Sequence, residues 1–415
     1  MKSTSISLEN QAVSYIDWKL LGIVLGLLII GLVSLFSATG ASGMEDSFNR
    51  QIISIGFGVF GALVLTFLPP NIMRYTSILF YTGSILLLLA VLFVGEEIYG
   101  TRGWIRFGGM SLQPAELSKF GVITMLGYFL SSKGTDITNI RDFSISAIII
   151  LIPFSLVFLQ PDHGTSSVLA ALFLGILFWS GFSQFALYFL ISIPFIIIFS
   201  LKGFWFSVSG VVIFTAITLF FKNKVIYKVL LILFFLGISY IAPNIYENLK
   251  DHQKARIETF LNPGADPRGQ GYNVIQSMMA VGSGGLTGKG LMQGTQTQLR
   301  YIPMQWTDFI FSVPAEEFGF MGSSALVLLF GFLLLRTLNI AYEADDRFYS
   351  VASFGIFSVF LYHILINIGM VLGLVPVMGI PLPFLSYGGT SMIVNFAFVG
   401  FLLNSYRNYR RKRLI

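Results

Sequence analysis

The residues best suited to chemistry are carboxylates in an otherwise apolar chain. Asp308 is the only carboxylate in the long polar, Gly-rich stretch 269–309, and it lies two residues before an apolar run that begins at 310. Glu316 and Glu317 follow about two helical turns deeper in that run. Carboxylates at membrane depth are costly unless they face a polar cavity, so all three are functional-site candidates. For the two glutamates a paired structural role stays open.

A second acidic and basic pair lies at the start of another apolar run. Gln113-Pro114-Ala115-Glu116 is typical of a helix start, with proline near the first turn and an acid at the positive end of the helix dipole. Lys119 is three residues on, so it shares a helix face with Glu116 and is expected to pair with it at the membrane surface. Asp162 also meets a helix start, where capping of a tight outer hairpin is favoured over direct chemistry.

Basic residues in two long connecting segments, 96–119 and 244–309, either anchor lipid headgroups or bind an anionic substrate. The candidates for the second role are Arg102, Arg256 and Lys289. The glycines before Lys289 do not form a Walker A loop, because Gly290 stands where that motif needs Ser or Thr and no strand precedes it.

The composition predicts an all-α polytopic membrane protein with 10–12 transmembrane helices and large outer loops. Of 415 residues, 55% are hydrophobic and 11% are charged, against about 25% charged in soluble domains. The apolar runs have the length of about 17–25 residues that crosses the hydrocarbon as a helix, and none alternates like a barrel strand. We read one integral membrane domain over 1–415, with an extra helical hairpin at 204–243. The expected spans are 19–39, 51–69, 75–95, 116–132, 143–160, 165–181, 184–201, 204–221, 226–243, 310–335, 350–373 and 390–405.

Residue counts exclude several classes of site. There is no cysteine, which excludes disulfides and thiolate chemistry, and the three histidines are too widely spaced for a His-based metal site. The net charge of +6 comes from residues scattered among the connectors, so nucleic acid is not an expected partner. Lys and Arg cluster in alternate connectors, which predicts that both termini are cytoplasmic and that 96–119 and 244–309 lie outside.

Seven blocks in order along the chain resemble the SEDS family, the shape, elongation, division and sporulation proteins. The blocks are QPAELSK (113–119), QPDHGTS (160–166), IQSMMAVGSGGLTGKG (275–290), GTQTQL (294–299), TDFIF (307–311), AEEFGFMG (315–322) and GIPLPFLSYGG (379–389). GTQTQL is more similar to the elongation member RodA than to the division member FtsW. Trp306 replaces the usual His before Thr-Asp, and His163 replaces the usual Leu of QPDLGT.

The resemblance implies a peptidoglycan glycosyltransferase that polymerises lipid II at the outer face of the bacterial cytoplasmic membrane, for elongation and rod shape. It implies a class B penicillin-binding protein, a transpeptidase, as partner. Asp308 matches the essential aspartate of the family, as general base or as ligand of a divalent cation (Mg²⁺ or Mn²⁺), and Glu116 and Lys119 match its functional acid and base. The alternatives are a lipid II flippase or transporter, a non-catalytic scaffold, and a division paralogue.

The predicted sidedness can be tested at the basic turn 222–228, which we expect in the cytoplasm. Asn223→Cys, on this naturally Cys-free chain, should resist an impermeant thiol reagent added outside sealed cells. A cysteine placed in the 96–119 segment should react under the same conditions. Labelling at position 223 would show that the 204–243 hairpin is wrongly placed.

Overall fold

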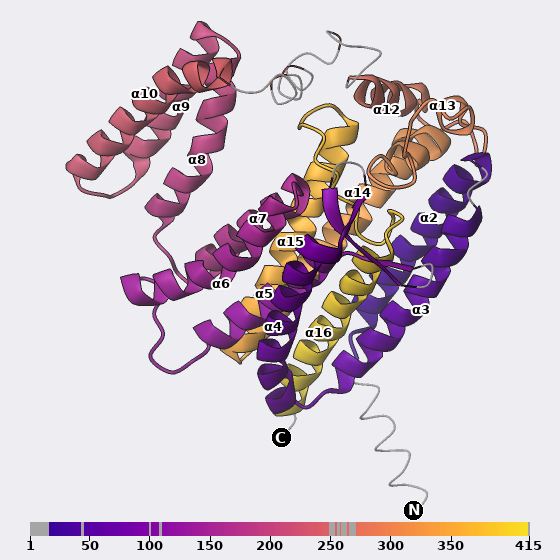
Figure 1. The fold of residues 1–415 in the computed structure, drawn as a ribbon, viewed down its shortest axis with the longest axis horizontal. Coiled ribbons are helices and arrows are strands. Elements are labelled where there is room, and N and C mark those ends of the chain that lie inside the picture. The colour runs from indigo at the N-terminus through magenta and orange to yellow at the C-terminus, as the bar shows by residue number, and fades with distance from the viewer. Residues whose placement is uncertain are drawn as a thin grey trace, which may run out of the picture. The chain divides into compact units, whose positions relative to one another are not determined.

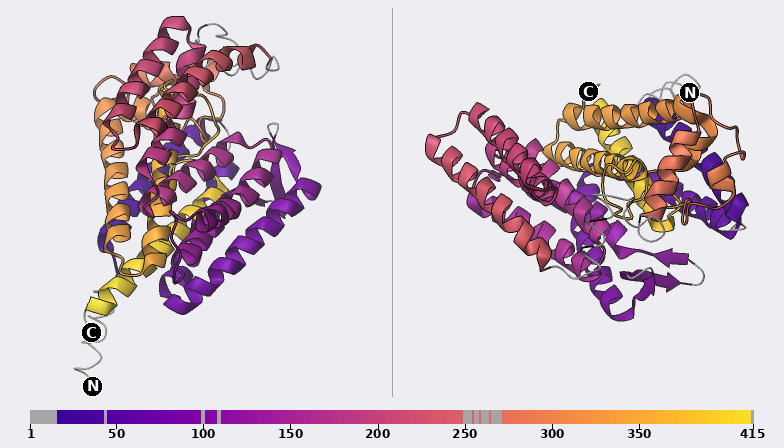
Figure 2. Two further views of the ribbon diagram at one scale, coloured as in Figure 1. Left: turned by 90° about the vertical axis from the view of Figure 1, so that its left-hand side faces the viewer. Right: turned by 90° about the horizontal axis from the view of Figure 1, so that it is seen from above.

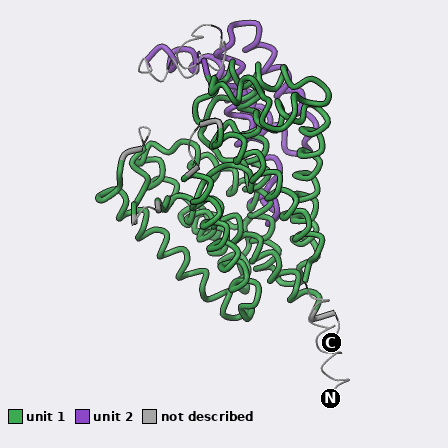
Figure 3. Tube along the Cα trace, turned by 90° about the vertical axis from the view of Figure 1, so that its right-hand side faces the viewer, with its two compact units in different colours: residues 1–176, 273–415 green, residues 177–272 purple. Residues whose placement is uncertain are grey.

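The computed structural model describes residues 16–42, 45–98, 101–107, 110–248 and 271–413, together with Lys254, Glu258 and Gly264. The chain divides into two compact units, 1–176 with 273–415 and 177–272 (Figure 3). Of the predicted connecting segment 244–309, most of 249–270 lies outside the described residues, and so does Arg256.

Helices account for nearly all of the described secondary structure, which confirms the all-α prediction, and each of the twelve predicted spans coincides with one helix. The larger unit holds most of them (Figure 1). They are α2 (Trp18–Ser42), α3 (Glu45–Phe67), α4 (Pro70–Val94), α5 (Pro114–Leu130), α6 (Ile140–Leu159), α7 (His163–Trp179), α14 (Ser312–Glu343), α15 (Arg347–Val371) and α16 (Gly389–Arg413), with the shorter α12 (Tyr272–Ser283) and α13 (Thr295–Gln298).

Eight of the described helices are both long and apolar enough to cross a membrane, and two shorter apolar ones, α7 and α9 (Phe204–Phe220), accompany them. The helices α5 and α16 fall outside these groups. The 17-residue α5 carries Glu116 and Lys119, and α16 ends in a basic run. Their charged residues therefore explain why these two helices do not count as apolar spans.

The helix α15 is the buried centre of the larger unit. In α15, 67% of the apolar window is buried, whereas the other seven long apolar helices reach only 17–39%. It packs against α14 on one side and α5 on another. At the α5 contact, a Cβ on Gly127 would lie 3.1 Å from the Phe348 carbonyl oxygen, so the glycine allows the two helices to approach closely.

The segment 96–112 before α5 forms a small antiparallel sheet, where the sequence had indicated only a connecting segment. Its strands are β1 (Glu96–Ile98), β2 (Thr101–Phe107) and β3 (Met110–Leu112), in the order β1-β2-β3. Figure 2 shows them beyond the end of α4. The residues TRGWIRF include β-branched and aromatic types that favour strands, and short pairing satisfies the backbone of a segment that is too short for a helix.

The helix α14 is interrupted near its start, at Gly319 (φ 64°, ψ −159°). Around this break the helix exchanges backbone hydrogen bonds with the Gly-rich segment 284–290. Lys289 N donates to Glu316 O (3.1 Å), Gly290 N donates to Glu317 O (3.0 Å) and Phe320 N donates to Gly285 O (2.8 Å). The Gly-rich segment therefore replaces the hydrogen bonds that the helix loses.

The smaller unit contains α8 (Gln184–Leu201), α9 and α10 (Val225–Glu247). Its core is formed by Ile196, Leu231 and Phe235, with partly buried aromatic residues packed around them. Most other apolar side chains of these helices are exposed, for example Trp205 and Phe220. Such exposed apolar surface is stable when lipid surrounds it.

The break in α14 predicts that Gly319 cannot be replaced. Its φ and ψ are essentially restricted to glycine, and a Cβ there would lie 2.3 Å from the Gly288 backbone nitrogen. Gly319→Ala should lower the melting temperature of the detergent-solubilised protein by many degrees. Gly331→Ala is the matched control, because Gly331 lies in the same helix and a Cβ there would have no atom within 4 Å, so it should be neutral or slightly stabilising. Equal melting temperatures for the two variants would contradict this interpretation.

Candidate functional site

Asp308 lies in the turn that leads into α14, and its side chain is half-buried. Its backbone carbonyl accepts a hydrogen bond from Asn367 Nδ2 (2.8 Å) in α15. Among the described residues, no hydrogen bond or ion pair engages its carboxylate. The backbone of Asp308 is therefore held in place, while its carboxylate is available to a ligand.

Burial raises the pKa of Asp308 to about 6, and the nearby negative charge of Asp162 adds to this effect. Asp162 lies at the start of α7 and caps that helix, as predicted. Thr165 N donates to its Oδ1 (2.9 Å), and Thr165 Oγ1 (2.8 Å) and Gln113 Nε2 (3.0 Å) donate to its Oδ2. Because Gln113 is the residue before α5, this contact joins the N-terminal ends of α5 and α7 beside Asp308.

Glu116 and Lys119 form the ion pair that their spacing predicts, with Lys119 Nζ 2.7 Å from Glu116 Oε1. The pair is buried inside the protein, since Glu116 is 4% exposed and Lys119 is 1% exposed. Packing of α5 against α4 and α15 encloses them. Lys119 Nζ also lies 3.2 Å from His363 Nε2, in α15.

The loop 376–388 holds the segment before Asp308 in place. Ser386 Oγ donates to Thr307 O (2.7 Å), and Tyr387 N donates to Trp306 O (2.8 Å). A Cβ on Gly379 would lie 3.6 Å from Asp308 Oδ2, so this loop borders the carboxylate directly. Trp306, which stands where the resemblance has His, thus contributes its backbone carbonyl to the support of the site.

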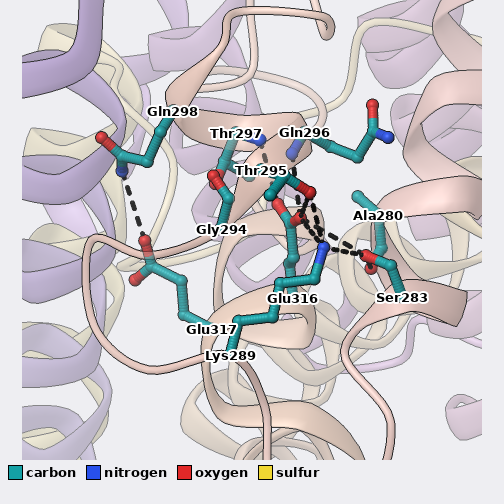
Figure 4. A network of polar contacts seen from close by, with 10 residues as sticks. All are labelled: Ala280, Ser283, Lys289, Gly294, Thr295, Gln296, Thr297, Gln298, Glu316 and Glu317. Atoms are coloured by element: carbon teal, nitrogen blue, oxygen red, sulfur yellow. Dashed lines mark hydrogen bonds and ion pairs between the residues drawn. The ribbon is translucent and has the colours of Figure 1, made fainter.

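Lys289 and Glu316 form a separate polar cluster (Figure 4). Lys289 Nζ lies 2.7 Å from Glu316 Oε1 and also donates to the hydroxyls of Ser283 (2.8 Å) and Thr295 (2.7 Å). Three contacts use the three N–H groups of the ammonium. Although we expected Lys289 to bind substrate, the geometry gives it a structural partner of its own.

Glu316 is fully buried and accepts further hydrogen bonds from the backbone N–H groups of Gln296 and Thr297, both at 2.9 Å. Its neighbour Glu317 accepts from the Ser37 hydroxyl in α2 and from Met292 N (3.1 Å). The two glutamates therefore secure the Gly-rich segment to α14 and α2, which is the structural role that the sequence had left open.

Of the remaining predicted site residues, Arg102 is exposed on β2, and no described contact joins it to Asp308 or Lys119. Arg256 lies outside the described residues. The structure thus places Asp308 near Asp162, and it pairs Glu116 with Lys119. Both pairs are connected to α15, Asp308 through Asn367 and Lys119 through His363.

The described residues contain no group of three or more His, Cys, Asp or Glu side chains that could hold a metal ion. A fully protein-ligated cation does not fit these residues. Mg²⁺ fits better, because it is commonly bound through one or two carboxylates, water and substrate phosphates. The unengaged carboxylate of Asp308 is the suitable ligand, since both oxygens of Asp162 already accept hydrogen bonds.

Sequence reasoning missed two residues of this arrangement, His363 and Asn367. Both lie in the apolar run LYHILINIG and are one helical turn apart. Polar side chains at this spacing within a membrane helix are themselves a signal, because they are rarely placed toward lipid.

Comparison with known proteins gives matches along nearly the whole chain. The model of the FtsW, RodA and SpoVE family of cell cycle proteins matches residues 15–206 and 205–411. Peptidoglycan glycosyltransferase MrdB of Escherichia coli K12 is 33% identical over 391 residues, which cover 94% of this chain and 93% of MrdB. Stage V sporulation protein E of Bacillus subtilis is 36% identical over 403 residues, covering 95% of this chain and 98% of that protein.

Solved structures show the same similarity. A chain of a peptidoglycan synthase complex, described as coordinating polymerization and crosslinking, superposes with a TM-score of 0.72 at 29% identity and covers 95% of this chain and 98% of that one. The rod shape determining protein RodA of Thermus thermophilus gives a TM-score of 0.62 at 25% identity, covering 95% of this chain and 97% of RodA.

The burial of Glu116 and Lys119 predicts how their replacement affects stability. Glu116→Leu or Lys119→Met leaves one buried charge unpaired, which costs about 3–5 kcal/mol. The double variant removes both charges, so its melting temperature should exceed that of either single variant. Single variants as stable as wild type would show that the pair is solvated.

Proposed function

The chain belongs to the family of cell cycle proteins that includes FtsW, RodA and SpoVE, and we propose that it polymerises lipid II into glycan strands at the outer face of the cytoplasmic membrane. It is a multi-pass membrane protein and a peptidoglycan glycosyltransferase. Relatives that are 31–33% identical over nearly the full chain are named for this activity. The observation that carries the site assignment is Asp308, a carboxylate with no described partner beside two helix starts.

Polymerisation joins the C4 hydroxyl of one disaccharide to the anomeric carbon of another, and polyprenyl diphosphate leaves. Asp308 accepts the hydroxyl proton in this proposal. A pKa of about 6 suits this role, since the carboxylate is ionised at neutral pH yet more basic than an ordinary aspartate. A positioned base supplies about 10²–10⁴-fold in rate.

Positive groups offset the charge of the departing diphosphate. The Lys119 ammonium uses two of its three N–H donors on Glu116 and His363, which leaves one for a phosphate oxygen. The N-terminal ends of α5 and α7, joined by Gln113 and Asp162, add helix dipoles that favour an anion. In this proposal Arg102, which is exposed on β2, contacts a headgroup.

A divalent cation, Mg²⁺ or Mn²⁺, would be held by Asp308 together with phosphate oxygens and water. Such an ion supplies charge neutralisation at the leaving diphosphate. Because the carboxylate of Asp308 has no described partner, it is available either to hold such an ion or to accept the hydroxyl proton.

The partner that we propose is a class B penicillin-binding protein, which cross-links the glycan as it forms. Support comes from the similar chain that belongs to a synthase complex for polymerization and crosslinking. We assign the chain to elongation because GTQTQL is more similar to RodA and because MrdB and RodA are among the relatives. Division remains the alternative, as FtsW proteins are 29–32% identical. A flippase would move lipid II without forming polymer.

We expect Asp308→Asn to make no glycan from purified lipid II in the presence of the partner, while wild type does. The wild-type rate should fall as pH drops through about 6, because protonation removes the base. Near-wild-type polymer from Asp308→Asn would refute the assignment, and titration of Mg²⁺ or Mn²⁺ into both proteins separates base from ligand.

The stability of Asp308→Asn provides a control for misfolding. The pKa of Asp308 is higher in the folded protein than its ordinary 3.8, so its ionisation weakens folding as pH rises from about 4 through about 6. At pH 7 to 8 the variant should therefore melt above wild type, and at pH 4 the two should melt alike. An inactive variant with a lower melting temperature at pH 7 would indicate misfolding.

A further inference from the structure

Two buried polar side chains of α15, His363 and Asn367, face the site from one side of the helix. They are 2% and 0% exposed, and their spacing of four residues places them on the same helix face, one turn apart. Buried polar groups are stable when hydrogen-bonded. Both ring nitrogens of His363 and the Nδ2 of Asn367 have partners on other segments of the site, whereas Asn367 Oδ1 has no described partner.

The contacts of His363 define its tautomer. Its Nδ1 lies 2.9 Å from the Pro381 carbonyl oxygen, which can only accept, so Nδ1 carries the proton. In the neutral ring Nε2 is then an acceptor. It lies 3.2 Å from Lys119 Nζ, which donates to it. His363 therefore joins the ammonium of Lys119 to the loop 376–388.

His363 sets the orientation of the Lys119 ammonium group. Glu116 alone would leave the ammonium free to rotate about one strong contact, whereas two acceptors, at 2.7 Å and 3.2 Å, fix the axis of the third N–H. A second negative partner would neutralise the charge further. A neutral imidazole orients the ammonium without removing its positive charge.

Asn367 performs the corresponding task for Asp308. Its Nδ2 donates to Asp308 O (2.8 Å) and to Ile380 O (2.7 Å), which uses both of its amide hydrogens. Ile380 and Pro381 are consecutive, so the two α15 side chains bind adjacent carbonyls of the same loop. The loop in turn holds Thr307 through Ser386.

We propose that His363 and Asn367 are positioning residues that set the Lys119 ammonium and the Asp308 carboxylate in one fixed geometry, through neighbouring carbonyls of the loop 376–388. This inference rests on the proposed function of Asp308 and Lys119. It assigns to α15 a role in the transfer reaction itself, because the cation for the leaving diphosphate and the group that receives the hydroxyl proton must be aligned with each other.

Three substitutions of His363 separate its two contacts. Gln places its amide near the Nε2 position and can accept from Lys119, Asn places its amide near Nδ1 and can donate to Pro381, and Phe keeps the ring shape without either contact. We expect His363→Phe to lower the saturated polymerisation rate about 10²-fold, with little change in KM for lipid II. His363→Gln should retain far more of the rate than His363→Asn.

Melting temperatures of all variants are measured in parallel. A merely structural His363 predicts that the rates of the Gln and Asn variants follow their stabilities, which would overturn the proposal. Ser353→Ala is the matched control on the same helix, because Ser353 is fully buried and its hydroxyl has no described partner, and its rate should equal that of wild type. If His363→Phe does not fold, the Gln and Asn comparison still decides.

A double-mutant cycle tests the shared loop. Asn367→Leu combined with His363→Gln should lose less rate than the product of the two single losses, since both residues act on the same loop; independent effects would overturn the coupling. Failure of the underlying function looks different, because wild type with its partner would then form no glycan at all. Active wild type with a fully active, stable His363→Phe refutes only the present inference.

Discussion

The rest of the site depends on the hydrogen bonds and the ion pair that the buried carboxylate of Glu316 makes with the Gly-rich segment. Irregular backbone at membrane depth must satisfy its polar groups inside the protein, and the Gly-rich segment before Asp308 does so against the broken start of α14. One carboxylate accepts from the Lys289 ammonium and from two consecutive backbone N–H groups. Backbone bonds on either side of Gly319 complete the junction. The chain therefore reaches Asp308 along a supported path.

The site is assembled from segments that are distant in the sequence and that meet at α15. The ends of α5 and α7, the turn before α14 and the loop 376–388 each contribute one element. The central and largely buried position of α15 makes it suitable as a common support, because close-packed protein interiors have low compressibility. Two of its buried polar side chains, His363 and Asn367, each join two other segments.

Asp308 shows how function and stability oppose each other in this arrangement. The structure leaves its carboxylate half-buried and without a described partner, near the charge of Asp162. A hydrogen-bond donor beside it would stabilise the fold and lower its pKa, but would also occupy the group. Lys289, by contrast, has all its donors engaged and contributes to the framework.

The sequence by itself determined the membrane class, the twelve helices and the pairing of Glu116 with Lys119, because hydropathy, helix-start patterns and i,i+3 spacing are local properties of the chain. It also singled out Asp308 as a candidate, whose role stays a prediction. It also supported the capping role of Asp162. Only the tertiary structure decided that the Glu116–Lys119 pair is buried, that Lys289 belongs to Glu316, and that His363 and Asn367 join Lys119 to Asp308. These facts depend on which segments pack around a side chain, and contacts between residues as far apart as 119 and 363 leave no periodic pattern in a single sequence.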